Sequence, residues 1–225
     1  MNESEFCQTL AERARQIGIR VDPPEQRRMF IHFQLLLHWN RRINLTGLSD
    51  PDNVVTTHFI DSLTLADLAD AGARVLDIGS GAGFPGLPLA VIRRDLTIVL
   101  SEAHAKKREF QEQAIRLLGV DRVSVISRSS KHENDLHLRG TFHVVVTRAL
   151  GGFDRILDAA LPFLRPDGRI LAMKGPRAFD ELAEHADRIE REGFAARVVR
   201  ETLLPDSGKK RLVVALDRIE DIDAA

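Results

Sequence analysis

The segment VLDIGSGAGFPG, from Val75 to Gly86, constrains the fold of this chain more than any other stretch. It begins as a continuous apolar run, which is typical of a buried strand, and continues into closely spaced glycines at the start of a helix. Glycine at such a turn permits positive φ and lets the backbone approach a ligand closely. Because ligands of open α/β sheets bind beyond the carboxyl ends of the strands, the turn predicts a nucleotide-type site.

Short apolar runs alternate with helical stretches in the chain after Gly72. The stretch AHAKKREFQEQAIRLLG between two of these runs is typical of a helix that ends at Gly119. Such alternation predicts βαβ units in a doubly wound α/β sheet. The two final runs, FAARVVRET and KKRLVVAL, are joined only by LLPDSG, so we expect a C-terminal antiparallel hairpin at one sheet edge. The five earlier runs are ARVLDI, LTIVLS, RVSVIS, FHVVVT and GRILAM.

The residues before Gly72 predict only helices. In DPPEQRRMFIHFQLLLHWN, Asp22 precedes two prolines and Glu25, which are signals of a helix start, and apolar residues then follow at helical spacing. A second apolar series from Phe59 to Leu68 predicts another short helix. We therefore expect an N-terminal helical cap over residues 1–71 and an α/β domain over residues 72–225.

Composition excludes several classes of protein. The chain has 225 residues, 44% of them hydrophobic, and a net charge of -1, so it is globular and any basic surface is local. The single cysteine, Cys7, excludes an internal disulfide, and the scattered histidines lack metal-ligand spacing, so we expect no metal. No stretch approaches the roughly 18 apolar residues of a membrane span, and no signal peptide is recognisable. We expect a cytoplasmic monomer without membrane contact.

Three ligand classes compete for the glycine turn. A phosphate-binding P-loop needs Gly-Lys-Ser/Thr at the helix start, and Phe84-Pro85-Gly86 does not supply it. A dinucleotide fold fits better, because the glycines from Gly81 spell G-x-G-x-x-G and Glu102 follows 21 residues after Gly81. An NAD-dependent oxidoreductase using GAGFPG is therefore one alternative. A non-catalytic RNA-binding module with a vestigial cofactor loop is another.

Asp77 favours the third ligand class. A carboxylate at the carboxyl end of the first strand would repel a pyrophosphate but would suit an ammonium group. S-adenosylmethionine carries such a group, and its ribose needs an acceptor that Glu102 can supply. The pattern D-x-G-x-G-x-G with an acid after the second strand resembles the class I methyltransferases, which have a Rossmann-like doubly wound sheet. Asp77, Gly81 and Glu102 are thus candidate cofactor-binding residues.

Further segments narrow the resemblance to one family. They occur in the family's order and span most of the chain: HWNRRINLTGLSDP (38–51), HFIDSL (58–63), DIGSGAGFPGLPLA (77–90), VTRAL (146–150) and LAMKG (171–175). Together they resemble the bacterial 16S ribosomal RNA guanine-N7 methyltransferase family, first called glucose-inhibited division protein B. The resemblance implies methyl transfer from S-adenosylmethionine to N7 of one guanine, at position 527 of 16S rRNA. The implied partner is 16S rRNA or the small ribosomal subunit.

The resemblance also implies roles for single residues. Gly79 and Phe84 match cofactor-binding positions in the glycine loop, and Ser129 and Ser130 match the pair that lies against the adenine. Arg148 matches an arginine at the cofactor and target site. Ser130 departs from the family pattern, because relatives often carry an acidic residue there. Recognition of the adenine amino group is then left to backbone carbonyls.

The chemistry of guanine N7 explains which motifs are missing. Enzymes that methylate exocyclic amines often carry Asn/Asp-Pro-Pro-aromatic after the fourth strand, where this chain reads VVVTRALGG. Enzymes that methylate C5 of pyrimidines need a cysteine nucleophile. Guanine N7 needs neither device, since its lone pair is free at neutral pH and catalysis is mostly alignment. Arg148 is the candidate catalytic residue, with two alternative roles: it anchors the RNA or the cofactor, or it donates a hydrogen bond to the guanine O6.

Basic residues cluster locally in spite of the near-neutral total. Arg41 and Arg42 lie beside His38 and Trp39, which add stacking surfaces, so this cluster is the first candidate for RNA contact. Lys174, at the end of the fifth strand, is a candidate for a phosphate contact. Two further basic clusters occupy residues 106–108 and residues 209–211.

Overall fold

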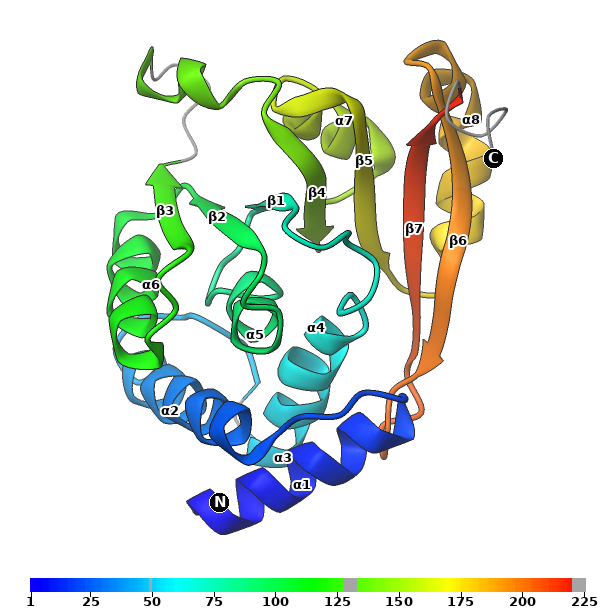
Figure 1. Cartoon of the computed structure of the whole chain (residues 1–225). Helices are drawn as coiled ribbons and strands as arrows, with labels where there is room; N and C mark the ends of the chain where they lie inside the picture. Colours follow the sequence, from blue (N-terminus) through cyan, green and yellow to red (C-terminus); the bar gives the residue numbers. More distant parts are fainter. Residues whose placement is uncertain (49, 128–132, 220–225) are drawn as a thin grey trace.

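The computed structural model describes residues 1–48, 50–127 and 133–219 (Figure 1). The N-terminal part is helical, with a π-helical turn in its third helix, and the remainder alternates strands with helices. The helical elements are α1 Glu3–Gln16, α2 Pro23–Asn40, α3 Pro51–Val54, η1 Val55–Ile60, α4 Asp61–Leu63, α5 Gly86–Ile92, α6 Ala105–Leu118, η2 Glu133–Leu138, α7 Phe153–Ala160 and α8 Ala178–Arg191. The strands are β1 Arg74–Ile78, β2 Thr97–Glu102, β3 Val123–Ser127, β4 Phe142–Arg148, β5 Leu164–Lys174, β6 Phe194–Leu203 and β7 Lys210–Arg218.

The strands of the described residues form one seven-stranded sheet in the order β3-β2-β1-β4-β5-β7-β6. The first five strands pair in parallel, and β7 pairs antiparallel with both β5 and β6. The order reverses direction between β1 and β4, and the turn after β1 therefore lies at the topological switch point. The predicted doubly wound sheet and its terminal antiparallel hairpin are both confirmed.

Helices cover both faces of the sheet (Figure 1). Successive strand residues point to opposite faces, so Val75 packs into the core under α5 and α6 while Leu76 packs under α7 and α8. The helical cap joins the first of these cores through residues such as Phe6, Met29 and Phe33, all 0–1% exposed. The cap and this face of the sheet therefore share one continuous hydrophobic core.

Helix α2 begins where the sequence predicts. Asp22 is the N-cap of α2, and its backbone N–H donates to the Glu25 carboxylate at 2.7 Å. The second predicted helix differs, because the helical run starts earlier, at Pro51, and passes through the π-helical turn before it ends at Leu63. Leu68 lies in the turns that follow. Wide π-helical turns often mark functional sites, and this one presents Thr57 and His58 to the cleft described below.

Ion pairs join the cap to the terminal hairpin. Arg13 of α1 donates to Asp206 in the turn between β6 and β7 at 2.6 Å and to Asp52 at 2.9 Å. Figure 1 shows this turn beside α1, at the end of the hairpin farthest from the C-terminus. Within the described ranges, no helix is long and apolar enough to cross a membrane.

Candidate active site

The glycine loop after β1 is built over the buried carboxylate of Asp77. Asp77 is 0% exposed, and its Oδ2 accepts the backbone N–H of Gly86 at 2.9 Å, while Oδ1 has no hydrogen-bond partner among the described residues. A Cβ on Gly86 would lie 2.3 Å from Leu100 Cδ2 and 2.9 Å from Asp77 Oδ2, so any other residue would have to displace these side chains. The carboxylate proposed from the sequence to suit an ammonium group is therefore buried, and the start of α5 takes one of its oxygens.

Burial also changes the ionisation of Asp77. Desolvation raises the pKa of Asp77 to about 7, while the hydrogen bond from Gly86 and the charge of Arg148 act in the opposite direction. A carboxyl group of this kind changes its charge near neutral pH. The loop is thus held by a buried carboxyl group that burial shifts toward its protonated form.

Glu102, at the end of β2, braces the other side of the loop. Its Oε2 accepts a hydrogen bond from the backbone N–H of Gly81 at 3.0 Å. Its Oε1 accepts one from the backbone N–H of His104 at 2.9 Å and lies 2.8 Å from Nδ1 of the His104 ring. Burial raises the pKa of Glu102, but these hydrogen bonds and the charge of Lys107 outweigh burial, so the pKa is lowered. Gln111, which sequence reasoning missed, completes the brace by donating to the Gly81 carbonyl at 2.8 Å.

Phe84 joins the loop to the cap. Its ring is 2% exposed and stacks between the rings of His32 and His58, with centroids 4.7 and 4.8 Å away. Burial lowers the pKa of His32 to about 4 and that of His58 to about 3, so both imidazoles are neutral near pH 7. The Nε2 of His32 also lies 2.9 Å from the Ala82 carbonyl. Phe84 therefore belongs to the packed base of the loop, with little surface open to a ligand.

Arg148 ends β4 beside this packed base. Its guanidinium carbon lies 5.4 Å from the centroid of the Phe84 ring, and its Nη1 donates to the Thr57 carbonyl at 3.1 Å. The same nitrogen lies 3.6 Å from Oδ2 of the buried Asp61. Burial lowers the pKa of Arg148, while the charges of Asp61 and Asp77 raise it. Ala149, the next residue, has a φ of 57°, which makes the chain turn sharply after the arginine.

A cleft of about 640 Å³ opens at the carboxyl ends of β4 and β5. Arg148 and Met173 are register partners, so the ends of the two parallel strands lie level at this edge. The antiparallel β7 begins at the same edge, since its Leu212 pairs with Lys174. The cleft is lined by Thr57, His58, Asp61, Thr147, Arg148, Ala149, Leu150, Gly151, Gly152, Ile156, Met173, Lys174, Gly175, Arg177, Glu181 and Arg211.

Lys174 lines the cleft but is already engaged. Its ammonium donates to Glu181 Oε2 at 2.6 Å and to the Gly151 carbonyl at 2.5 Å, and it lies 4.6 Å from the centroid of the Phe153 ring. The side chain is only 9% exposed. The predicted phosphate contact would therefore require Lys174 to exchange or share its carboxylate partner.

Arg211 lines the cleft, although the sequence indicated it only as part of a basic cluster. It belongs to the basic cluster at residues 209–211, but Lys209 and Lys210 do not line the cleft. Lys210 instead pairs with Glu201 at 2.7 Å. An antiparallel hairpin at the edge of a parallel sheet puts the start of its last strand at the carboxyl edge, and that signal could have found Arg211 from the sequence.

The family model described as rRNA small subunit methyltransferase G (GidB) matches residues 25–209 of this chain. The chain belongs to the GidB family. It is 36% identical to the ribosomal RNA small subunit methyltransferase G of Syntrophotalea carbinolica, over 93% of this chain and 96% of that protein, and 34% identical to that of a Geobacter species over the same shares.

Solved structures confirm the fold of this GidB protein. A SAM-dependent methyltransferase from Aquifex aeolicus matches with a TM-score of 0.54 at 20% identity, over 77% of this chain and 96% of that one. A precorrin-6y C5,15-methyltransferase from Geobacter metallireducens matches with a TM-score of 0.51 at 17% identity, over 70% and 85%. The predicted class I methyltransferase fold and the predicted family are confirmed, and the oxidoreductase alternative has no support.

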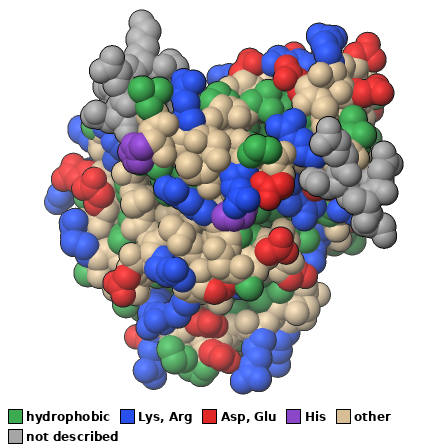
Figure 2. Space-filling model, turned by 45° about the horizontal axis from the view of Figure 1, so that its top comes forward, with side chains coloured by type: hydrophobic (Ala, Val, Ile, Leu, Met, Phe, Trp, Pro, Cys, Tyr) green, Lys and Arg blue, Asp and Glu red, His purple; other side chains and the backbone are tan. Residues whose placement is uncertain are grey.

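The other predicted RNA contacts of the GidB chain lie outside the cleft. Arg41 and Arg42 are exposed just beyond the end of α2. Their loop is tied to the cleft, because the Thr46 hydroxyl lies 2.7 Å from Nε2 of His58. Trp39 is partly buried against the core. On the face shown in Figure 2, Lys and Arg side chains are interspersed with Asp and Glu rather than gathered in one patch.

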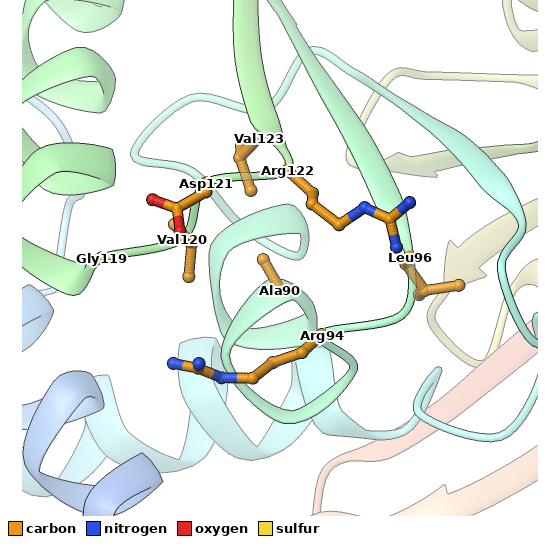
Figure 3. Close-up of a pocket in the computed structure, with 8 residues that line it drawn as sticks. All are labelled: Ala90, Arg94, Leu96, Gly119, Val120, Asp121, Arg122 and Val123. Atoms are coloured by element: carbon orange, nitrogen blue, oxygen red, sulfur yellow. The ribbon is translucent and has the colours of Figure 1, made fainter.

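Ser129 and Ser130, the predicted adenine contacts, lie outside the described residues, as all of residues 128–132 do. A second cavity, of about 160 Å³, lies between α5 and the start of β3. Figure 3 shows the guanidinium groups of Arg94 and Arg122 pointing away from each other there.

Among the described residues, no group of three His, Cys, Asp or Glu side chains could hold a metal ion.

Proposed function

We propose that this chain transfers the methyl group of S-adenosylmethionine to N7 of a guanine in the 16S rRNA of the small ribosomal subunit. Membership of the rRNA small subunit methyltransferase G family supports the cofactor and the class of RNA. The observation that carries the proposal is the position of Arg148, which lies between the glycine loop and the cleft. The guanine at position 527 is the proposed target by resemblance.

The residues of the glycine loop fit the cofactor. Gly79, Gly81 and Gly83 have φ of 77°, 57° and 79°, so the loop backbone is open to close approach. Oδ1 of the buried Asp77 has no hydrogen-bond partner among the described residues, so an ammonium group that reaches it would satisfy it, and the carboxylate of Glu102 keeps acceptor capacity for a ribose hydroxyl. When bound, S-adenosylmethionine supplies an electrophilic methyl group on a sulfonium. These residues would hold it, together with Phe84 beneath the loop and with Ser129 and Ser130.

The cleft supplies alignment rather than proton transfer. Guanine N7 carries no proton, so no general base is required, and His58 in the cleft is neutral near pH 7. Arg148 can donate to the guanine O6 while it remains bonded to the Thr57 carbonyl. Proximity and orientation of this kind contribute on the order of 7–11 kcal/mol to catalysis. Arg148 is thus the proposed catalytic residue.

The proposal extends to the organisation of the chain. Residues 1–71 act as a cap and residues 72–225 bind S-adenosylmethionine, and the cap supplies Thr57, His58 and Asp61 to the cleft. The enzyme acts as a monomer without a metal ion. Arg41, Arg42 and Lys174 contact the RNA around the cleft. Sedimentation of the purified protein tests whether it is a monomer. Assays with a chelator test whether the activity is independent of a metal ion.

The product of the reaction tests the proposed function. Purified protein is incubated with labelled S-adenosylmethionine and either small ribosomal subunits or naked 16S rRNA that lack the modification, and the digested RNA is analysed by mass spectrometry. The expected product is 7-methylguanosine, with its fixed positive charge. A methyl group on an exocyclic amine or on carbon would contradict the proposal. Arg148→Lys should slow the reaction, whereas Arg94→Lys at the second cavity is the matched control.

Binding tests the cofactor separately. A ligand at 100 times its dissociation constant raises the free energy of unfolding by about 2.7 kcal/mol. S-adenosylmethionine should therefore raise the melting temperature of the protein, and NAD should not. Stabilisation by NAD alone would contradict the assignment of the glycine loop.

A further inference from the structure

The buried carboxylate of Asp61 holds two arginines that come from distant parts of the chain. Its Oδ2 lies 3.6 Å from Nη1 of Arg148 at the end of β4, and its Oδ1 lies 3.4 Å from Nε of Arg211 near the start of β7. The Asp61 side chain is 3% exposed, whereas the two arginine side chains are 20% and 25% exposed. The Asp61 carboxylate is thus almost fully buried at the wall of the cleft, and both guanidinium groups border the cleft.

Among the described residues, the guanidinium of Arg211 donates no hydrogen bond. Its contact with Asp61 is an ion pair that falls short of hydrogen-bond geometry, since Asp61 Oδ1 has no hydrogen-bond partner among the described residues. Arg148, in contrast, donates one of its N–H groups to the Thr57 carbonyl. A guanidinium carries five N–H donors in a planar fork suited to phosphate. Arg211 can therefore accept an anionic ligand without giving up a strong bond.

The charges of the cleft favour an anion. The lining residues include four cationic side chains, of Arg148, Lys174, Arg177 and Arg211, against two acidic ones, of Asp61 and Glu181. The cleft thus has an excess of two positive charges in a chain whose net charge is -1. This excess is complementary to a nucleotide with its flanking phosphate.

The two arginines contact different oxygens of Asp61. Arg148 also lies over the ring of Phe84 in the glycine loop, whereas Arg211 borders the cleft from the start of β7. A base that is to be methylated must reach the loop, and the phosphate attached to its sugar must then lie farther out. The geometry places Arg148 toward the base and Arg211 toward the phosphate.

We propose that Arg211 binds a phosphate of the target nucleotide and that Asp61 is the positioning residue that holds Arg211 and Arg148 in one fixed pair. The inference rests on the proposed function, because it names the part of the RNA that enters the same cleft. A ligand without a phosphate would leave Arg211 unused. The pair therefore selects a nucleotide within an RNA chain over a free base.

The salt dependence of binding tests Arg211. Affinity for unmodified small ribosomal subunits is measured at several salt concentrations for the parent, for Arg211→Gln and Arg211→Lys, and for Arg197→Gln, which removes a guanidinium 63% exposed elsewhere on the hairpin. Arg211→Gln should bind about tenfold to a hundredfold more weakly. Its log–log slope should fall by about 0.7–0.9, and Arg211→Lys should restore the slope. Arg197→Gln should behave like the parent.

The single-turnover rate tests Asp61. With subunits and cofactor saturating, Asp61→Asn should react more slowly than the parent, because Arg148 loses its partner, while its calorimetric affinity for S-adenosylmethionine and its melting curve show that the fold is kept. In an Arg211→Gln background the effect of Asp61→Asn on subunit affinity should shrink, because the pair is already broken. Additive effects of the two substitutions on subunit affinity would overturn the positioning role.

Two failures can be told apart in these experiments. If the parent protein makes no 7-methylguanosine, the proposed function fails. If the parent makes it but Arg211→Gln keeps the parental affinity and slope, the phosphate contact lies elsewhere and only the present inference is overturned.

Discussion

The substitution Asp77→Asn tests how the glycine loop is held. Asp77 is fully buried, with Oδ2 bonded to the Gly86 N–H and Oδ1 without a partner in the part of the chain that the structure describes, and its pKa is raised from 3.8 to about 7, chiefly by burial. Asparagine has the same shape, keeps an acceptor for Gly86 and cannot ionise. The unpaired position persists in the variant, so that contribution to the free energy of unfolding largely cancels between the two proteins.

The sign of the effect follows from the direction of the pKa shift. Because the folded protein binds this proton more tightly than the unfolded chain, the ionisation of Asp77 lowers stability as pH rises from about 4 to about 7. Each unit of pKa difference corresponds to about 1.4 kcal/mol, so the full effect above pH 7 is about 4 kcal/mol. Asp77→Asn should match the parent below pH 4 and exceed it by up to that amount at pH 8.

Urea unfolding of both proteins between pH 4 and pH 8 measures this difference. The titration of other groups, including His32 and His58, cancels when the two free energies are subtracted. Glu102→Gln is the control of opposite sign: the pKa of Glu102 is lowered, so its charge stabilises the fold above its unfolded pKa and this stabilisation is lost on acidification. A difference between Asp77→Asn and the parent that stays constant with pH would refute the reasoning, since it would mean that the carboxylate is fully compensated when folded.

The same variant separates two roles of Asp77. If its free oxygen binds the ammonium group of the cofactor, Asp77→Asn should weaken S-adenosylmethionine binding at pH 8 by roughly 1.5–3 kcal/mol. If the carboxylate only braces the loop, isothermal calorimetry should find the parental affinity.

Three other predictions concern the loop, the core and the RNA surface. Gly86→Ala should lower the free energy of unfolding by about 1–3 kcal/mol in urea, because its Cβ would lie 2.3 Å from Leu100 Cδ2. The pKa of His32 is lowered to about 4, so the parent should lose up to about 3 kcal/mol of stability as pH falls from 6.5 to 4, and urea unfolding should find this loss absent in His32→Gln. Arg42→Ala should reduce the salt slope of subunit binding by about 0.7–0.9, and Arg20→Ala, at the far end of α2, should not.

Local signals in the sequence determined the elements of this protein. The β-branched runs, the glycine loop and the start of α2 at Asp22 depend on preferences of neighbouring residues, and each occurs where the sequence predicts. The π-helical turn was missed, because its i to i+5 bonding has no distinct apolar spacing. The family and its cofactor also follow from short motifs, since the loop and its acidic partners are close in the chain.

Only the tertiary structure decided which side chains meet at the site. Asp61, Arg148 and Arg211 are far apart in the sequence, and they converge because the cap packs on one face of the sheet while β7 runs back along β5. Asp77 and Lys174 stand at the predicted strand ends, but the start of α5 and Glu181 engage them there. A sequence pattern places a residue on an element, whereas the direction and partners of its side chain depend on long-range packing that no local pattern contains.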